Sequence, residues 1–334
     1  MSRYASAHAN VQGPGDARPT ALQIIEDEEL KGKLYGKVIV ITGTSSGIGI
    51  ETARALALTG ARLFLTARNV TKAKDVLGDI FDHGYIELVE MEQTSFHSVR
   101  TAARNILTKT DKINILINNA GVLAGENREL TDDGYELHFQ TNHLSHFLFF
   151  ELLKPALLKA ISPDFHSRVI VVSSSLHHTS GINASDNYNF EHGGYTNVVA
   201  YGQSKTANIY MANEIERRHG SQGLHALSVH PGGILTNLPR HASQAELDAW
   251  KKVEGFSKTL KSPEQGAATS VWAAIGRQLE GKGGKYLADV AEADASTNAP
   301  DDNQALYRGY AKHAYSPKLE TRLWEDSLKL VGLE

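Results

Sequence analysis

The chain has 334 residues, of which 41% are hydrophobic and 22% are charged, and its formal net charge is −4. These values are typical of a globular protein, and so small a net charge excludes the strong field that would attract nucleic acid or an anionic membrane surface. The chain contains no cysteine, which excludes disulfides, thiolate nucleophiles and cysteine zinc sites and suits a reducing, cytoplasmic compartment.

The first twenty residues, MSRYASAHANVQGPGDARPT, lack the apolar core that a signal peptide requires. Their small, polar, glycine and proline residues predict a flexible arm over residues 1–20, followed by one domain over 21–334. The most apolar later stretch, LSHFLFFELLKPALL, is interrupted by histidine, charged residues and proline. We therefore expect no membrane span.

Short β-branched runs alternate along the chain with stretches of helical period. The runs occupy residues 37–42, 61–66, 85–90, 113–118, 168–173, 224–230 and 284–288. The helical stretches include GIETARALALT, SVRTAARNILTKT, AYGQSKTANIYMANEIERR and SPEQGAATSVWAAI. This alternation predicts an α/β fold, a single-domain Rossmann-type doubly wound parallel sheet of about seven strands with helices on both faces.

Two irregular segments, 175–198 and 232–262, each follow a predicted strand. Ligands of open α/β sheets bind beyond the carboxyl ends of strands, so both segments should border a site. Segment 232–262 is the predicted substrate loop, and residues 290–334 form a C-terminal extension. The apolar residues that indicate a lipophilic pocket in the loop are Leu235, Leu238, Trp250, Val253 and Phe256.

A glycine-rich turn follows the first predicted strand, in VIVITGTSSGIGIETARALALTG. Its glycines, Gly43, Gly47 and Gly49, have the spacing GxxxGxG. A strand that re-enters as a helix through such a turn directs backbone N–H groups and the positive end of a helix dipole at one point, which attracts phosphate. By itself, the motif also fits a glycine-rich turn that binds nothing.

Arg68 stands where the second predicted strand ends, 19 residues after Gly49. NAD-binding turns carry an acidic residue about 20 residues beyond the glycines, which binds the ribose 2′-hydroxyl. A guanidinium instead pairs with a 2′-phosphate, so Arg68 predicts NADP(H). The alternative is a solvated arginine preceding a helix that Asn69 caps.

Tyr201 and Lys205 lie one helical turn apart in AYGQSKTAN, and a serine cluster that includes Ser174 ends the preceding strand. A tyrosine pKa near 10 suits acid–base chemistry at neutral pH only if a cation favours the phenolate, and Lys205 is placed to be that cation. Tyr201 would then exchange a proton with a substrate oxygen that Ser174 polarises. Ser175 is an alternative to Ser174.

Six motifs appear together in order: TGTSSGIG, NNAG, TNHLSHF, VSS, YGQSK and HPGGILT. With them the chain resembles the short-chain dehydrogenase/reductase family, most closely a fungal-type variant of its retinol dehydrogenase and WW-domain oxidoreductase-like branch. The resemblance implies a Ser174–Tyr201–Lys205 triad, with Asn142 holding a water that relays protons through Lys205. Glu92 departs from the pattern, since the family usually has aspartate there.

The resemblance, together with the reasoning on Arg68, defines the residues expected at the cofactor. These are Gly43, Ser45, Ser46, Gly47, Ile48, Gly49, Arg68, Glu92, Gln93, Asn119, Ala120, Gly121, Tyr201, Lys205, Pro231, Gly232, Ile234 and Thr236. No metal is expected, although His143 and His146 share a helix face. His177 and His178 are expected on a loop surface or at the border of the substrate.

The resulting hypothesis is an NADP(H)-dependent oxidoreductase that transfers hydride reversibly between nicotinamide and a carbonyl or alcohol of a lipophilic small molecule. A polyketide- or steroid-type ketoreductase of secondary metabolism is an alternative. So is a non-catalytic NADP-binding sensor or scaffold. The apolar helices around TNHLSHFLFFELL and SKTANIYMANEI permit a homodimer or homotetramer.

Overall fold

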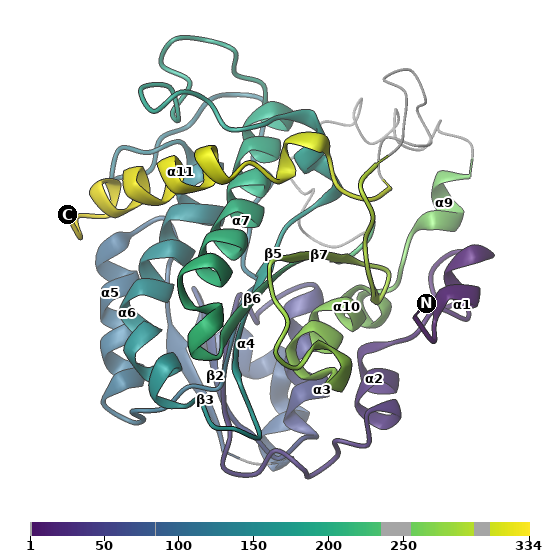
Figure 1. Ribbon diagram of the computed structural model, residues 1–334. Coiled ribbons are helices and arrows are strands. Elements are labelled where there is room, and N and C mark those ends of the chain that lie inside the picture. Colours follow the sequence, from purple (N-terminus) through teal and green to yellow (C-terminus); the bar gives the residue numbers. More distant parts are fainter. Residues whose placement is uncertain (1, 84, 235–254, 297–307) are drawn as a thin grey trace.

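The structure is a computed structural model that describes residues 2–83, 85–234, 255–296 and 308–334. An eight-stranded sheet of order β3-β2-β1-β4-β5-β6-β7-β8 forms its centre (Figure 1). The strands are β1 (Val38–Thr42), β2 (Arg62–Ala67), β3 (Ile86–Glu90), β4 (Ile115–Asn118), β5 (Ser167–Val172), β6 (Leu224–His230), β7 (Lys285–Ala288) and β8 (Ala291–Glu292). The strand order reverses between β1 and β4, which is where sheets of this kind bind ligands.

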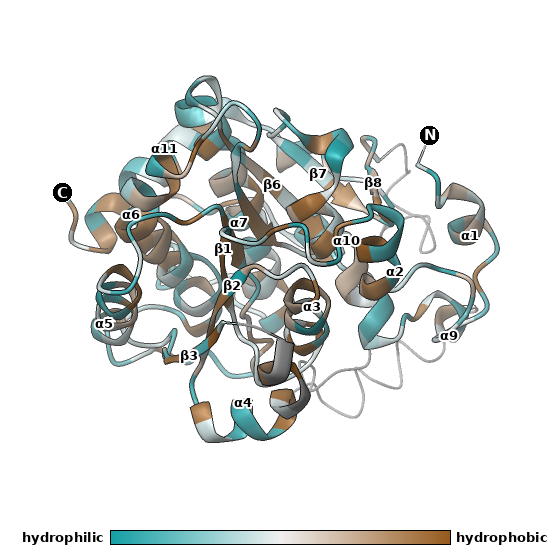
Figure 2. Ribbon diagram, turned by 90° about the horizontal axis from the view of Figure 1, so that it is seen from below, coloured by the Kyte–Doolittle hydropathy of each residue, from teal (hydrophilic) through white to brown (hydrophobic). Residues whose placement is uncertain are grey.

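Helices cover both faces of the sheet (Figure 1). One face carries α5 (Phe96–Leu107), α6 (Ser145–Lys159) and α7 (Asn197–His219), with α11 (Pro317–Leu330) packed on α7. The other carries α2 (Ala21–Asp27), α3 (Ile48–Ala57), α4 (Val70–Leu77) and α10 (Pro263–Ile275). Two short helices, α1 (Ala5–Ala9) and α9 (Phe256–Thr259), lie near one another at the edge of the molecule, as Figures 1 and 2 both show.

Short 3-10 and π-helical segments complete the described elements. They are η1 (Gly78–His83), the π-helical η2 (Phe139–Leu144), η3 (Ser175–Thr179), η4 (Gly220–Gln222), η6 (Arg277–Leu279) and η7 (Lys312–Ala314). The π-helical turn η2 leads directly into α6. In the described ranges no helix is both long enough and apolar enough to cross a membrane.

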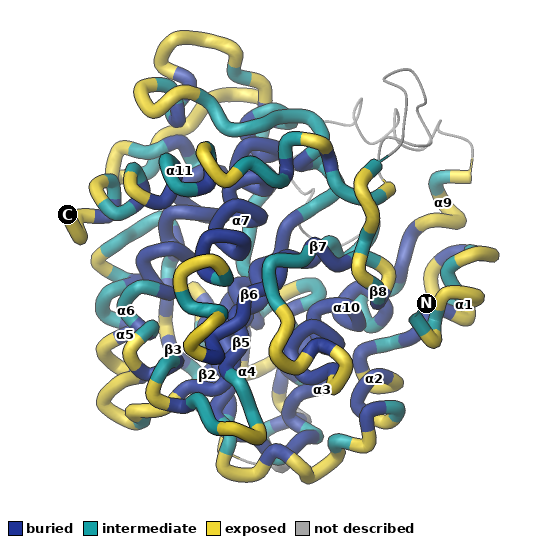
Figure 3. The backbone as a smooth tube through the Cα atoms, viewed as in Figure 1, coloured by how far each residue is buried: buried dark blue, intermediate teal, exposed yellow. Residues whose placement is uncertain are grey.

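The strands supply both hydrophobic cores. In β1, Val38 and Val40 pack into the cluster beneath α5, α6 and α7, whereas Ile39 and Ile41 pack into the cluster beneath α2, α3 and α10. Successive side chains of a strand point to opposite faces, so a sheet covered on both sides needs continuous apolar runs. Figure 3 shows the strands and the inner helices buried and the connecting loops exposed.

Local sequence sets where the helices begin. Asn69 accepts a hydrogen bond from the backbone of Lys72 at 2.8 Å and caps α4, as predicted. Thr196 caps α7 in the same way. Ser262 and Gln265 form a reciprocal capping box at the start of α10. Such caps satisfy N–H groups that the first helical turn leaves without partners, so these boundaries follow from the sequence.

Two expectations differ from the structure. The predicted sheet had about seven strands, but β8 adds an eighth, antiparallel to β7 and only two residues long, too short to show a periodicity. Residues 1–20 were expected to be a flexible arm, yet α1 forms within them and the side chain of Arg18 is buried against residues 258–260. The arm expectation rested on composition, which does not report contacts with distant residues.

Candidate active site

The glycine turn lies between β1 and α3, and contact with backbone explains its glycines. Gly43 has φ +73°, and a Cβ there would lie 2.8 Å from the Cα of Ala120. A Cβ on Gly49 would lie 2.2 Å from the carbonyl oxygen of Gly43. Gly47, at φ +60°, is the residue before the first turn of α3. The glycines thus let the backbone pack closely at the N-terminus of α3, where N–H groups and the helix dipole favour an anion.

The remaining turn residues border the same place. Ser45 and Ile48 are half-buried, and Ser46 is exposed. Ile48 and Ile234, from the turn after β6, both face Gly266 of α10, where an added Cβ would lie within 3 Å of each side chain. The turn after β1 and the turn after β6 therefore both pack against Gly266.

Arg68 and Glu92 follow β2 and β3 and form an ion pair, with Nε and Oε2 3.5 Å apart. The Arg68 side chain is 65% exposed, so its guanidinium remains accessible at this edge. Gln93 follows Glu92, and its backbone carbonyl accepts a hydrogen bond from the Ser145 hydroxyl. The Gln93 side chain is buried. The predicted arginine and its acidic neighbour therefore lie together beyond the carboxyl ends of adjacent strands.

The turn after β4 is joined to the glycine turn by Asn119. Its side-chain amide donates to the carbonyls of Thr42 at 2.8 Å and Gly43 at 3.3 Å. The backbone N–H groups of Asn119 and Ala120 both donate to the Thr42 hydroxyl at 2.9 Å. Gly121 allows the Lys205 side chain to lie close to this turn, since a Cβ on Gly121 would lie 3.4 Å from the Lys205 ammonium. NNAG thus holds two turns together.

Asn142 lies in the π-helical turn before α6. Its side chain donates to Ser204 at 2.9 Å and to the carbonyl of Val122 at 3.1 Å, and it accepts from the Val122 N–H at 2.8 Å. These bonds hold the Asn142 side chain against Val122 and Ser204. The water relay that the resemblance implies stays a prediction.

His146 connects Asn142 with the glycine turn. Its Nδ1 lies 3.0 Å from the Asn142 carbonyl and its Nε2 lies 2.9 Å from the Thr42 hydroxyl. That hydroxyl already accepts two N–H groups, from Asn119 and Ala120, so it donates to Nε2 and the imidazole proton is on Nδ1. Burial lowers the pKa of His146 to about 4. The ring is a neutral connector.

Ser174, Tyr201 and Lys205 converge at the ends of β5 and α7. Tyr201 and Lys205 are 4% and 3% exposed, and the Lys205 ammonium lies 5.4 Å from the centre of the Tyr201 ring. It also donates to the carbonyl of Val172 at 3.1 Å. Ser174, and not Ser175, is near enough to Tyr201 to lower the pKa of its hydroxyl. The predicted triad residues therefore lie together.

Burial dominates the titration of this pair. It raises the pKa of Tyr201 to about 12, although the hydrogen bond with Ser174 opposes that rise. It lowers the pKa of Lys205 to about 7. We expected the Lys205 cation to lower the tyrosine pKa, but among the protein's own groups it is the Ser174 hydroxyl that does so. The reason is that removal from water disfavours the charged form of both groups.

The turn after β6 begins with Pro231 and Gly232, and Gly232 has φ +105°. Ile234 forms a parallel bridge with Lys261, whose N–H donates to the Gly233 carbonyl at 2.8 Å. Thr236 lies outside the described residues, as do Leu235, Leu238, Trp250 and Val253 of the predicted apolar pocket. Phe256, in α9, is described and half-buried.

Sequence reasoning misplaced one residue near the triad. His177 was expected on a loop surface or at the substrate, but it is completely buried. Its Nδ1 lies 2.6 Å from the Ser174 carbonyl, and its Nε2 accepts from the backbone of Ala311 at 2.9 Å. It therefore connects Ser174 to the C-terminal extension. No local pattern marks this contact, because Ala311 is 134 residues away.

Buried polar atoms without protein partners lie at the same edge. They are Nε2 of Gln93, both side-chain polar atoms of Asn118, and Oδ1 of Asn119. Such atoms are rarely left without a partner in folded proteins. Together with the glycine turn at the N-terminus of α3, they fit a dinucleotide that supplies hydrogen-bond donors and acceptors.

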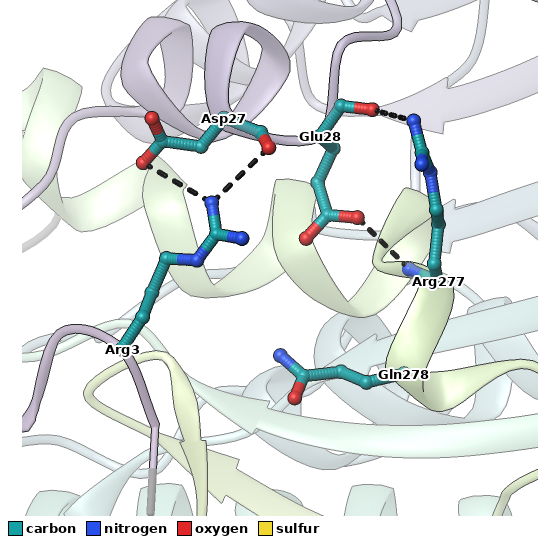
Figure 4. Close-up of a pocket in the computed structure, with 5 residues that line it drawn as sticks. All are labelled: Arg3, Asp27, Glu28, Arg277 and Gln278. Atoms are coloured by element: carbon teal, nitrogen blue, oxygen red, sulfur yellow. Dashed lines mark hydrogen bonds and ion pairs between the residues drawn. The ribbon is translucent and has the colours of Figure 1, made fainter.

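Two other features do not belong to the site. Among the described residues, no group of three or more His, Cys, Asp or Glu side chains has the arrangement of a metal centre. A surface hollow of about 380 Å³ lies at the opposite edge of the sheet, between α2 and the segment that leads into β7 (Figure 4). Its polar groups have partners within its own wall: Arg3 pairs with Asp27, the guanidinium of Arg277 donates to the backbone carbonyl of Glu28, and the Glu28 carboxylate accepts from the backbone N–H of Arg277.

Comparison with known proteins agrees with this geometry. The family model described as short chain dehydrogenase matches residues 37–247. The short-chain dehydrogenase/reductase prx1 of Penicillium roqueforti is 46% identical over 331 residues, covering 99% of this chain and 95% of the relative. Retinol dehydrogenase 12 of Mus musculus is 34% identical over 305 residues, covering 90% and 88%.

Among solved structures, an uncharacterised protein from Mycobacterium paratuberculosis has a TM-score of 0.67 at 27% identity, with 95% of this chain and 98% of that chain covered. These findings confirm the predicted resemblance, including its fungal, retinol-dehydrogenase-like branch, and the Rossmann-type fold. The chain therefore belongs to the short-chain dehydrogenase/reductase family, whose members are oxidoreductases with a nicotinamide cofactor.

Proposed function

We propose that the protein is an NADP(H)-dependent reductase of a carbonyl group on a lipophilic small molecule, acting reversibly, with Tyr201 as the general acid and base. The observation that carries this proposal is the arrangement of Tyr201, which lies near Ser174 and one helical turn before Lys205, whose ammonium lies beside Gly121.

The protein's own residues then perform the proton chemistry. Ser174 donates a hydrogen bond to the substrate oxygen and orients it beside Tyr201. Tyr201 gives its proton to that oxygen during reduction and takes it back during oxidation. Lys205, with a pKa of about 7, can replace the proton at neutral pH. The bound nicotinamide supplies or accepts the hydride.

The first test is the substitution Tyr201→Phe. NADPH consumption is measured against aldehydes, ketones and quinones, and the best substrate is then given to the variant. Removal of a general acid lowers kcat by about 10²–10⁴-fold, while the melting temperature should stay near that of the wild type. Undiminished turnover by the variant would show that the mechanism is wrong.

The preference for NADP(H) rests on Arg68. Its exposed guanidinium lies beyond β2 and would pair with a 2′-phosphate. Arg68→Ala should weaken NADPH binding roughly tenfold and leave NADH binding unchanged, since a hydrogen bond to a charged group contributes about 1.5–3 kcal/mol. Lys72→Ala, an exposed cation on the neighbouring helix α4, is the control. A wild-type preference for NADH would contradict this role.

The substrate panel also separates the alternatives. Retinoid-like aldehydes, steroid ketones and β-keto thioesters represent the retinol dehydrogenase-like and the secondary-metabolism ketoreductase hypotheses. NADPH binding without turnover of any member would favour a sensor or scaffold. The buried triad supports catalysis over that alternative, because a scaffold needs only the cofactor turns.

We also propose that the chain is a monomer and does not dimerise through the face formed by α6 and α7. The helices that were expected to permit a homodimer, α6 and α7, are covered by α11 of the same chain. Trp324 of α11 is 4% exposed, and its ring lies 4.8 Å from that of Phe147 and 6.1 Å from that of Phe150. Light scattering should give the mass of one chain, and a dimer mass would contradict the proposal.

A further inference from the structure

Lys261 is a buried lysine between α9 and α10 that packs against the turn after β6. It is 4% exposed, and its ammonium donates to the carbonyl of Pro231 at 3.3 Å. Its aliphatic chain lies over Gly232, where an added Cβ would be 2.7 Å from the lysine Cδ. Its backbone also holds the turn, through the bond to Gly233 and the bridge to Ile234. One residue therefore contacts the whole of this turn.

The charge of Lys261 is balanced by Asp289, in the bend between β7 and β8. Their side chains are 2.7 Å apart. Asp289 has φ +53°, a conformation that is costly for a non-glycine residue and indicates that its surroundings hold it there. Its carboxylate also lies 3.3 Å from Nδ1 of His8 in α1. The ion pair thus connects the turn to the N-terminal segment.

A second connection runs through Arg18. Its buried guanidinium donates to the carbonyls of Gly13 at 3.1 Å, Thr259 at 2.8 Å and Leu260 at 2.5 Å, and it pairs with Asp16 at 2.8 Å. Thr259 and Leu260 directly precede Lys261. Because a guanidinium has five donors in a rigid plane, these bonds fix the backbone that presents Lys261.

We propose that Lys261 is a positioning residue for the turn Pro231–Ile234, which the family resemblance places at the nicotinamide, and that the N-terminal segment holds Lys261 in place through Arg18 and His8. This inference rests on the proposed nicotinamide function. It gives the N-terminal segment, which lies outside the matched family region 37–247, a role in cofactor binding. The turn is held by side chains from three distant parts of the chain.

The test uses two probes. NADPH contains the nicotinamide, whereas 2′,5′-ADP reproduces only the adenosine part, bound at the other turns. Lys261→Met keeps the aliphatic packing over Gly232 and removes the charge. We expect it to raise the Kd for NADPH roughly tenfold, as loss of a charged hydrogen bond does, and to leave the Kd for 2′,5′-ADP unchanged.

Arg18→Met should likewise raise the Kd for NADPH and leave the Kd for 2′,5′-ADP unchanged, although Arg18 lies far in the sequence from the residues expected at the cofactor. Lys258→Met is the matched control, because Lys258 is an exposed lysine on α9, three residues before Lys261. It should change neither Kd. Melting temperatures of all variants report whether the fold is intact.

The outcomes distinguish the two proposals. If wild-type protein binds neither NADPH nor NADH, the proposed function fails and this inference fails with it. If the wild type binds NADPH and Lys261→Met binds it equally well, only the inference is overturned. An equal loss of affinity for NADPH and 2′,5′-ADP also overturns it, because Lys261 then supports the fold and not the turn.

Discussion

The turns after β1 and after β6 face the same site but are held in different ways. The first is packed against backbone: a Cβ on Gly49 would meet the Gly43 carbonyl, and Asn119 from the neighbouring strand closes it. The second is packed against the side chain of Lys261, which depends on Asp289. The first turn therefore tolerates no added atom, whereas the second can adjust.

The largest effect should follow Gly49→Ala. The new methyl would overlap backbone that cannot move without displacing β1, and overpacking of this kind costs about 1–3 kcal/mol. NADPH affinity should fall by about tenfold to a hundredfold. Gly78→Ala is the control, since a Cβ there meets nothing within 4 Å and its φ is −39°. Isothermal titration measures both.

Gly232→Ala should have a smaller effect. The methyl would meet the end of a flexible lysine, which can move, although the positive φ still costs about 1 kcal/mol or more. We expect NADPH affinity to fall roughly fivefold. Lys261→Ala in the same chain should relieve the overlap but leave the strain. A greater loss of NADPH affinity than Gly49→Ala causes would contradict the difference between the two turns.

Lys205 lies beside Gly121, in the turn after β4, and gives a prediction on pH. Burial lowers the pKa of Lys205 from 10.5 to about 7 in the folded chain. Between these values only the unfolded chain holds the proton, so this group makes the free energy of unfolding rise with pH across that window. Denaturant unfolding within and below the window should show the rise, and Lys205→Met should abolish it. An unchanged slope would contradict the assignment.

The smallest effect belongs to Asp289. Burial alone would raise its pKa, but the hydrogen bond with His8 and the charge of Lys261 outweigh burial and hold the pKa well below 3.8. The ion pair therefore adds stability above pH 3.8 that is lost as the pH falls through the lower folded value. Asp289→Asn should lose little stability near neutral pH and show a weaker acid dependence. Because the carboxylate is 56% exposed, solvent screening limits the effect.

Local patterns predicted much of the fold. Asn69 was predicted to cap a helix, and it does so because its side chain accepts from an N–H group three residues later. Thr196 and Ser262 cap helices in the same way. The apolar runs of the strands predicted a sheet buried on both sides. β8 was missed because two residues carry no period, and the packing of the first twenty residues was missed because Arg18 acts on residues about 240 positions away.

The sequence by itself determined the parallel strands of the sheet and the motifs that follow them, because strand alternation, helix caps and short motif spacings are encoded within a few residues. These motifs name the residues that were expected to meet at the carboxyl edge of the sheet. Only the tertiary structure decided that Ser174 rather than Ser175 reaches Tyr201 and that Lys261 packs against the turn after β6. It also decided that burial raises the pKa of Tyr201 and lowers the pKa of Lys205, so that both groups favour their neutral forms. These depend on burial and on contacts between distant segments, which no local pattern records.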